Sequence, residues 1–248
     1  MNAFADNDLV LVSPRYLAGS GSKLADALGP LIHLFHWHHH HDPASGHIGL
    51  DSPCGTMFVD FEPTRHDGMW WNVRHHEPYW QAQFSRQTPI EAIAAVTQAL
   101  PQLLSDTRHA DRIPLTPQTI AQSAGLNSWT SHSEEGTTVR TSPDGHCVLT
   151  HEPSIELTWQ IRNSLYEGFD TKWSATFTFD TPEPVVAQFF AHLTSGVPVE
   201  RVFGEVPFLV RGSASALITP VRGAAVNPHT HHAVAQADQA YTDRHRRR

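Results

Sequence analysis

Ser142-Pro143-Asp144-Gly145 repeats Ser52-Pro53-Cys54-Gly55 at an offset of 90 positions, and the residues after each turn repeat as well. The offset drifts only between 88 and 93 along the chain, as short loop insertions would produce. The further matching pairs are Glu62-Pro63 with Glu152-Pro153, Trp71-Asn72-Val73-Arg74 with Trp159-Gln160-Ile161-Arg162, Trp80-Gln81-Ala82-Gln83-Phe84 with Trp173-Ser174-Ala175-Thr176-Phe177, and Thr88-Pro89 with Thr181-Pro182. The chain is therefore two copies of one unit, and this duplication decides the architecture.

Each copy shows the pattern of four strands followed by one helix. In residues 80–85, Trp80, Ala82 and Phe84 alternate with polar side chains, which is typical of a sheet with one wet face. The first copy predicts strands over 47–51, 56–61, 70–75 and 80–85, and the second over 137–140, 146–151, 158–162 and 172–179.

The helix of the first copy has a distinct beginning at Thr88-Pro89-Ile90-Glu91. Thr88 is expected to cap the helix, Pro89 to occupy its first position, and Glu91 to complete a capping box. The expected buried stripe is Ile90, Ile93, Ala94, Thr97 and Leu100. The second helix begins at Thr181-Pro182 and is expected to bury Val186, Phe189, Phe190 and Leu193.

These elements predict an α+β fold of tandem pseudo-symmetric ββββα repeats, with antiparallel sheets and one packed helix each. Because a single such unit buries little apolar surface, we expect the two units to pair and share one core. The first predicted division is 9–106, the first repeat, with an N-terminal strand and a helix over 23–35 that Gly29-Pro30 breaks or kinks. The second is 112–203, which opens with a short helix near Thr116-Pro117. The third, 204–248, is a mostly flexible extension in which Phe208-Leu209-Val210 could add a strand.

Composition excludes some classes of protein. Of the 248 residues 40% are hydrophobic, yet no apolar run has the roughly 18 residues of a membrane helix. The N-terminus lacks the pattern of a signal peptide, and the two cysteines do not imply a disulfide, so a cytoplasmic location is expected. The net charge is −8, but residues 222–248 carry five Arg and two Asp, which leaves a balance of −11 for the rest. Such a body argues against a broad electrostatic footprint for nucleic acid, although a local one stays possible.

Several of these segments resemble a known family. The run Val12-Ser13-Pro14-Arg15-Tyr16-Leu17-Ala18-Gly19, the turn at 142–145 and the Trp…Phe…Thr-Pro-x-Glu ending of the first copy are similar to the domain-of-unknown-function family 317, the SPDY-type domain. This family is widespread in streptomycetes and often occurs as tandem copies. The resemblance implies an actinobacterial, non-secreted protein, and it brings no established activity or cofactor.

Motifs that would name a reaction are missing. The sequence has no P-loop, no Gly-x-Ser-x-Gly elbow, no His-Glu-x-x-His and no glycine-rich dinucleotide turn, so we expect no enzyme and no cofactor. The run of His38, His39, His40 and His41 is expected to be a solvated loop and only a weak metal candidate, because adjacent histidines lack a fixed geometry. Cys54 is expected to be a turn residue without a lowered pKa.

The polar face of the predicted sheets is the stronger candidate for function. It carries amides, hydroxyls and one Arg per copy, whereas a merely solvated face usually carries more Lys and Glu. The candidate nucleic-acid-binding residues are Arg74, Arg162, Asn72, Gln81, Gln83 and Gln160, with Tyr79 and Trp70 as contact aromatics. The paired tryptophans Trp71, Trp159, Trp80 and Trp173 are expected in the core.

Two functions stay open from the sequence. Tandem ββββα units with exposed sheets are similar in topology to Whirly proteins, which implies a module that binds DNA, single- or double-stranded, with Arg74 and Arg162 on phosphates. The alternative is a protein-interaction or scaffold module that pairs with another protein or with itself. A metal-binding protein or an enzyme is the third and weakest hypothesis.

Overall fold

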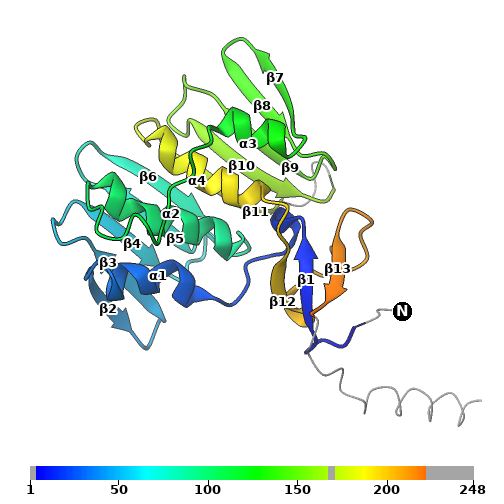
Figure 1. Ribbon diagram of the computed structural model, residues 1–248, viewed down its shortest axis with the longest axis horizontal. Helices are drawn as coiled ribbons and strands as arrows, with labels where there is room; N and C mark the ends of the chain where they lie inside the picture. Colours follow the sequence, from blue (N-terminus) through cyan, green and yellow to red (C-terminus); the bar gives the residue numbers. More distant parts are fainter. Residues whose placement is uncertain (1–3, 167–170, 222–248) are drawn as a thin grey trace, which may run out of the picture.

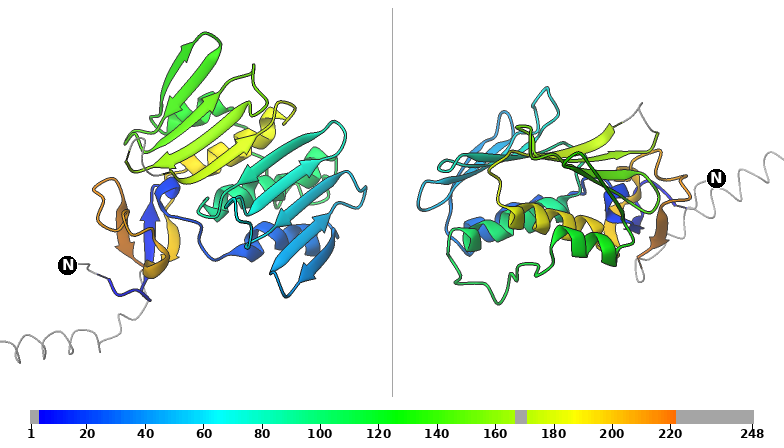
Figure 2. Two further views of the ribbon diagram at one scale, coloured as in Figure 1. Left: turned by 180° about the vertical axis from the view of Figure 1, so that it is seen from behind. Right: turned by 90° about the horizontal axis from the view of Figure 1, so that it is seen from above.

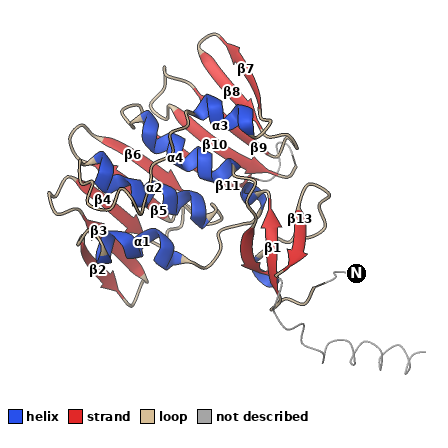
Figure 3. Cartoon of the chain, viewed as in Figure 1, coloured by secondary structure: helices blue, strands red, loops and turns tan. Residues whose placement is uncertain are grey.

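A computed structural model of the chain describes residues 4–166 and 171–221, which form two antiparallel sheets and a layer of α-helices (Figures 1 and 3). The larger sheet has ten strands in the order β2-β3-β4-β5-β6-β11-β10-β9-β8-β7. Its strands are β2 (His38–Asp42), β3 (His47–Asp51), β4 (Met57–Phe61), β5 (Trp71–His75), β6 (Trp80–Phe84), β7 (Thr130–Glu134), β8 (Thr137–Thr141), β9 (Cys147–His151), β10 (Trp159–Ser164) and β11 (Thr171–Phe177). Strand order on one side of the β6–β11 pair mirrors the other, so the two copies are related by a pseudo-two-fold axis.

The helices all lie on one face of this sheet (Figure 2). They are α1 (Leu24–His33) and α2 (Ile90–Leu103) in the first copy, and α3 (Ile120–Leu126) and α4 (Glu183–Thr194) in the second. Helix α2 packs between α1 and α4, and α3 packs on α4. The α+β class and the antiparallel pairing are thus confirmed, and each unit is αβββββα rather than ββββα.

Each unit has one strand more than the four predicted, β2 in the first copy and β7 in the second. These strands were not predicted because their sequences show no hydrophobic alternation. Strands β2 and β7 form the two outer edges of the sheet, and every residue in both is exposed. The histidine run is therefore an edge strand and not a loop. The eight strands that do have an apolar face are all found close to their predicted bounds.

One core lies between the sheet and the helices. Trp71, Trp80, Trp159 and Trp173 are all buried in it, as predicted. The predicted stripes of α2 and α4 are buried as well. The two copies meet at Phe84 of β6, Phe177 of β11 and Phe189 of α4, whose ring centroids lie 5.2 to 5.7 Å apart.

The join between β6 and β11 is short, and hydroxyl groups extend it. Only Ala82, Gln83 and Phe84 pair with partners in β11. Beyond them the amide of Ser85 donates to Ser174 O (2.9 Å) while Ser85 Oγ accepts from Ser174 N (2.8 Å).

At the other end of the join the same exchange recurs with the copies reversed. The amide of Thr178 donates to Gln81 O (3.0 Å), and Thr178 Oγ1 accepts from Gln81 N (2.8 Å). A hydroxyl in each copy thus replaces the carbonyl that a continuing strand would supply.

The repeated Thr-Pro pair serves this join as well. Thr88 Oγ1 donates to Ser174 O (3.3 Å) and Thr181 Oγ1 donates to Gln81 O (3.4 Å), each across the seam to the other copy. The predicted capping role is wrong: the caps of α2 and α4 are Pro89 and Pro182, without a side-chain hydrogen bond. These two threonines are repeated because each copy needs one to hold the other.

Helix α1 runs through Gly29-Pro30 without the predicted break. Proline has no N–H, so the carbonyl of Asp26, four residues earlier, loses its helical donor. Gln98 Nε2 of α2 donates to that carbonyl instead (2.7 Å), and Thr97 Oγ1 donates to the neighbouring Ala27 O (2.6 Å). Packing against α2 therefore compensates for the proline.

A second sheet of three strands joins parts of the chain that we assigned to different divisions. Its order is β12-β1-β13, with β1 (Leu9–Ser13), β12 (Val199–Val202) and β13 (Leu217–Pro220). Short 3-10 helices η1 (Arg15–Leu17) and η2 (Phe203–Glu205) follow β1 and β12. The predicted extension thus contributes a strand at 217–220 and not at Phe208, which is exposed. Its residues 222–248 lie outside the described residues.

A buried arginine ties the small sheet to the first copy. Arg201 of β12, with 1% of its side chain exposed, donates to both carboxylate oxygens of Glu91 on α2 (2.7 Å each). It also donates to the carbonyls of Ala18 and Gly19. Glu91 therefore completes this ion pair rather than a capping box.

Within the described ranges, no helix is both long and apolar enough to cross a membrane.

We predict that Thr88→Val and Thr181→Val each lower the free energy of unfolding by about 1 kcal/mol, because each removes one of the hydrogen bonds that a carbonyl of the other copy accepts across the seam. Urea unfolding followed by circular dichroism measures this change. Thr150→Val, on a half-buried position of β9 away from the seam, is the control and should change it little. Equal losses at all three positions would contradict a special role for the seam threonines.

We predict that Gly21→Ala destabilises the fold more than Gly55→Ala does. Both glycines have a left-handed φ (+71° and +72°), so alanine costs about 1–2 kcal/mol of backbone strain at either one. A Cβ on Gly21 would also lie 2.8 Å from Arg201 Cζ, whereas one on Gly55 would meet nothing within 4 Å. The two midpoints in urea therefore separate strain from the clash, and coinciding midpoints would show that Arg201 is not held firmly.

Candidate nucleic-acid interface

The outer face of the large sheet lies opposite the four helices (Figure 2). At its centre are β5, β6, β11 and β10, which together carry Arg74, Arg162 and Lys172 but no Asp or Glu. The chain as a whole has a net charge of −8. The middle of this face is therefore locally basic within an acidic molecule, and Lys172 is a contributor that the sequence analysis missed.

Arg74 is held by neighbours on its own face. Its Nη2 donates to Asp60 Oδ2 at 2.8 Å, and its guanidinium lies 5.6 Å from the Phe58 ring centroid. Asp60 also lies 3.3 Å from His47 Nε2. Since a carboxylate neutralises it, Arg74 is a poorer candidate for a phosphate contact than the sequence suggested.

Arg162 is the more available of the two arginines. It is exposed, and its Nη2 donates to the neutral Oε1 of Gln160 (2.8 Å). Among the described residues it forms no ion pair. Thr150 stands in the second copy where Asp60 stands in the first, which explains why Arg162 keeps its positive charge uncompensated.

The two arginines lie diagonally across the seam. Arg74 is opposite Gln81 and Arg162 is opposite Ser174, so they sit at opposite ends of the β6–β11 join. Three strand steps and four residues along a strand put their backbones about 20 Å apart. A ligand that reaches both must therefore be extended and must cross the seam.

The predicted amides form a connected row beside Arg74. Gln81 Nε2 donates to Asn72 Oδ1 (2.7 Å), and Tyr79 OH donates to Gln81 Oε1 (3.3 Å). Asn72 is buried, whereas Gln83 and Gln160 are half-buried and Tyr79 is exposed. The face therefore offers fixed amides together with an exposed aromatic ring.

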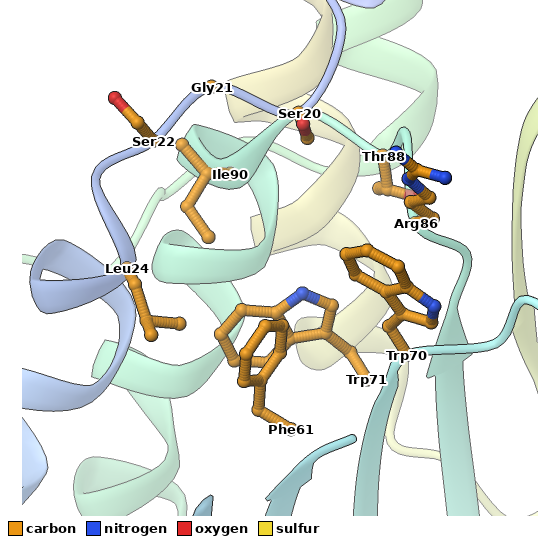
Figure 4. Close-up of a pocket in the computed structure, with 10 residues that line it drawn as sticks. All are labelled: Ser20, Gly21, Ser22, Leu24, Phe61, Trp70, Trp71, Arg86, Thr88 and Ile90. Carbon is orange, nitrogen blue, oxygen red and sulfur yellow. The ribbon is translucent and has the colours of Figure 1, made fainter. Parts of the chain in front are cut away.

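Trp70 does not belong to this face. It lines a pocket between the sheet and the helix layer with Phe61 and Trp71 (Figure 4). Seven of the eight predicted site residues therefore lie on or beside the outer face. The eighth, Trp70, was assigned to that face wrongly. Trp70 stands immediately before β5, where the strand alternation that we used to assign faces does not hold.

The histidine run does not bring its four rings together. His38 and His40 alternate with His39 and His41 along β2, so they project to opposite faces. His40 packs over Gly49 and against His47, with 5.1 Å between ring centroids. In the part of the chain that the structure describes, no three His, Cys, Asp or Glu side chains are gathered as metal ligands.

The two cysteines have opposite environments. Cys54 is exposed, and its Sγ lies 3.3 Å from Ser52 Oγ and 3.1 Å from Thr56 Oγ1. These hydrogen bonds, that of Ser52 first, lower the pKa of Cys54, which corrects our expectation of no such effect. Burial raises the pKa of the Cys147 thiol.

We therefore predict that Ellman's reagent titrates one thiol in the folded protein and two after unfolding. Because hydrogen bonds stabilise the thiolate of Cys54, its reaction rate should reach half of its plateau at a lower pH than that of free cysteine. Cys54→Ser should abolish the reaction of the folded protein. Reaction of two thiols before unfolding would contradict the burial of Cys147.

The comparisons with known proteins agree with the duplicated architecture. The family model SPDY, described as domain of unknown function (DUF317), matches residues 51–103 and 141–199. These ranges run from the turn before β4 to the end of α2, and from the equivalent turn to the start of β12. No curated protein and no solved structure matches the chain. The chain thus carries two tandem copies of the SPDY domain.

Proposed function

We propose that this chain is a non-enzymatic nucleic-acid-binding module that holds a single strand across the outer face of the ten-stranded sheet. The observation that carries the proposal is that the four central strands of that face hold no Asp or Glu and that Arg162 on them is exposed, with no ion pair among the described residues. Such a face can attract phosphates even though the whole protein is acidic, because physiological salt screens the acidic side chains that lie more than about 10 Å away.

The shape and chemistry of the face suit a strand without sequence preference. Ten strands at a spacing of about 4.8 Å span roughly 43 Å, which is enough for several nucleotides. Amides such as Gln83 and Gln160 offer neutral hydrogen bonds, and the exposed ring of Tyr79 offers a stacking platform. The predicted likeness to Whirly proteins rested on four strands per repeat and stays a prediction, as does the cytoplasmic location.

We predict micromolar binding of a fluorescein-labelled oligonucleotide of about 16 nucleotides, measured by fluorescence anisotropy. Because Asp60 neutralises Arg74, we count Arg162 and Lys172 alone, so the logarithm of affinity should fall with a slope near −1.4 against the logarithm of salt, or about sevenfold between 50 and 200 mM. Arg162→Gln should weaken binding and reduce the slope by about 0.7.

The matched control is Arg112→Gln, which removes the same charge beside Ala99 and Gln188 of the helix layer. It should leave the affinity unchanged. A duplex of the same length tests whether the face prefers single strands. No salt-dependent binding of either form, or an equal loss in both variants, would refute the proposal.

A protein-interaction function is the alternative, and the sheet edges favour it. Strand β2 pairs only with β3 and β7 only with β8 within the described chain, and both are exposed throughout. An open edge can add a strand from another chain. Light scattering after size exclusion tests self-pairing: a mass that stays monomeric up to high concentration would exclude it.

A further inference from the structure

A pocket of about 200 Å³ lies where the first copy's strands end and α2 begins (Figure 4). Phe61, Trp70 and Trp71 supply aromatic walls, Leu24 and Ile90 supply aliphatic ones, and Arg86 stands at the rim beside Trp70. The segment of Ser20, Gly21 and Ser22 closes one side. Its volume is below the 300–1,000 Å³ or so of sites for drug-sized ligands, so it suits a single ring or a fused pair of rings.

The second copy shows which of these residues the fold itself requires. Trp71 and Thr88 have the same residue types at their counterparts, Trp159 and Thr181. Four other lining residues differ: Phe61, Trp70, Arg86 and Ile90 correspond to His151, Thr158, Phe179 and Glu183. At these four positions of the pocket the fold does not dictate the residue type.

The counterpart region in the second copy is arranged differently. The His151 ring stacks on Trp159 with 3.7 Å between centroids, whereas Phe61 lies tilted against Trp71 at 4.8 Å. Burial, with the nearby Arg140, lowers the pKa of His151, and Glu183 opposes this effect. The aromatic wall of the pocket is thus not repeated at the corresponding described residues of the second copy.

Arg86 gives the pocket its charge preference. Its Cζ lies 4.9 Å from the Trp70 ring centroid, it is exposed, and it forms no ion pair with any residue that the structure describes. A guanidinium that lies over an indole ring and forms no ion pair can still donate its N–H groups to a ligand. Those donors match a carboxylate bidentately.

We propose that this pocket binds a small planar aromatic carboxylate. The ring packs against the wall that Phe61, Trp70 and Trp71 form together, where aromatic pairs gain more than their buried area alone provides. The carboxylate stays at the rim on Arg86, so no charge has to be buried. This site is separate from the outer face of the sheet, because its lining comes from the inner side of the strands and from α2.

The experiment uses the full chain and 2-naphthoate as the probe, with quenching of tryptophan fluorescence and calorimetry as readouts. We expect saturable binding of one equivalent, and at least tenfold weaker binding of 2-naphthol, which lacks the charge, and of cyclohexanecarboxylate, which lacks the aromatic ring. Arg86→Gln should weaken 2-naphthoate by about tenfold and leave 2-naphthol unchanged. Trp70→Leu should weaken both aromatic probes.

The control Arg162→Gln removes an exposed arginine from the other face and should bind 2-naphthoate as the unaltered chain does. Arg86 is exposed, so its variant is expected to fold, and its circular dichroism is compared with that of the parent. Unsaturable quenching, equal binding of the three probes, or an Arg86→Gln variant with unchanged affinity would overturn the proposal. None of these outcomes bears on oligonucleotide binding, which is measured independently.

Discussion

The hydroxyl-extended join between β6 and β11 is the contact on which the rest of the molecule depends. Each copy alone would be a five-stranded sheet with an open central edge. Three residue pairs close that edge, and Ser85 and Thr178 then continue the hydrogen bonding where the strands diverge. Because the same two exchanges occur with the copies reversed, neither copy can slide along the other without losing both.

This join also determines which surface stays free. With β6 and β11 paired, α2 and α4 come together on one side and bury Phe84, Phe177 and Phe189 between the copies. All four helices are then needed on that side, and the other side is left to polar side chains. The hydroxyl groups of Ser85 and Thr178 already accept hydrogen bonds across the seam, so on this face they are not free to bind a ligand as acceptors of those same bonds.

Much of the fold could be predicted from the sequence, because strands with one apolar face reveal themselves by alternation. Strands β2 and β7 could not, since an exposed edge strand such as His38–Asp42 has no apolar side. The role of Thr88 was misjudged for another reason. A Thr-Pro pair before a helix favours a local cap, and only the tertiary structure brings Ser174 O within reach of the hydroxyl.

The candidate site was predictable in its position but not in its electrostatics. Alternation placed Arg74 and Arg162 on one face, yet it could not show that Asp60, from a neighbouring strand, would neutralise only the first. Trp70 was misplaced because it stands just outside the strand whose alternation was used.

Comparison of the two copies therefore separates residues that the fold needs from residues that could serve binding. Residues that the copies share, such as Thr88 with Thr181, hold the halves together and would be required whatever the protein binds. Two of the regions where the copies differ bear on the proposals: the arginine neighbours on the outer face, where Asp60 corresponds to Thr150, and the aromatic pocket on the inner side, where Trp70 corresponds to Thr158. In the two functions that we propose, the second copy is the one that receives an anion on the sheet, and the first copy is the one that receives an aromatic ring beneath it. Because the two regions lie on opposite sides of the same sheet, occupancy of one leaves the other accessible.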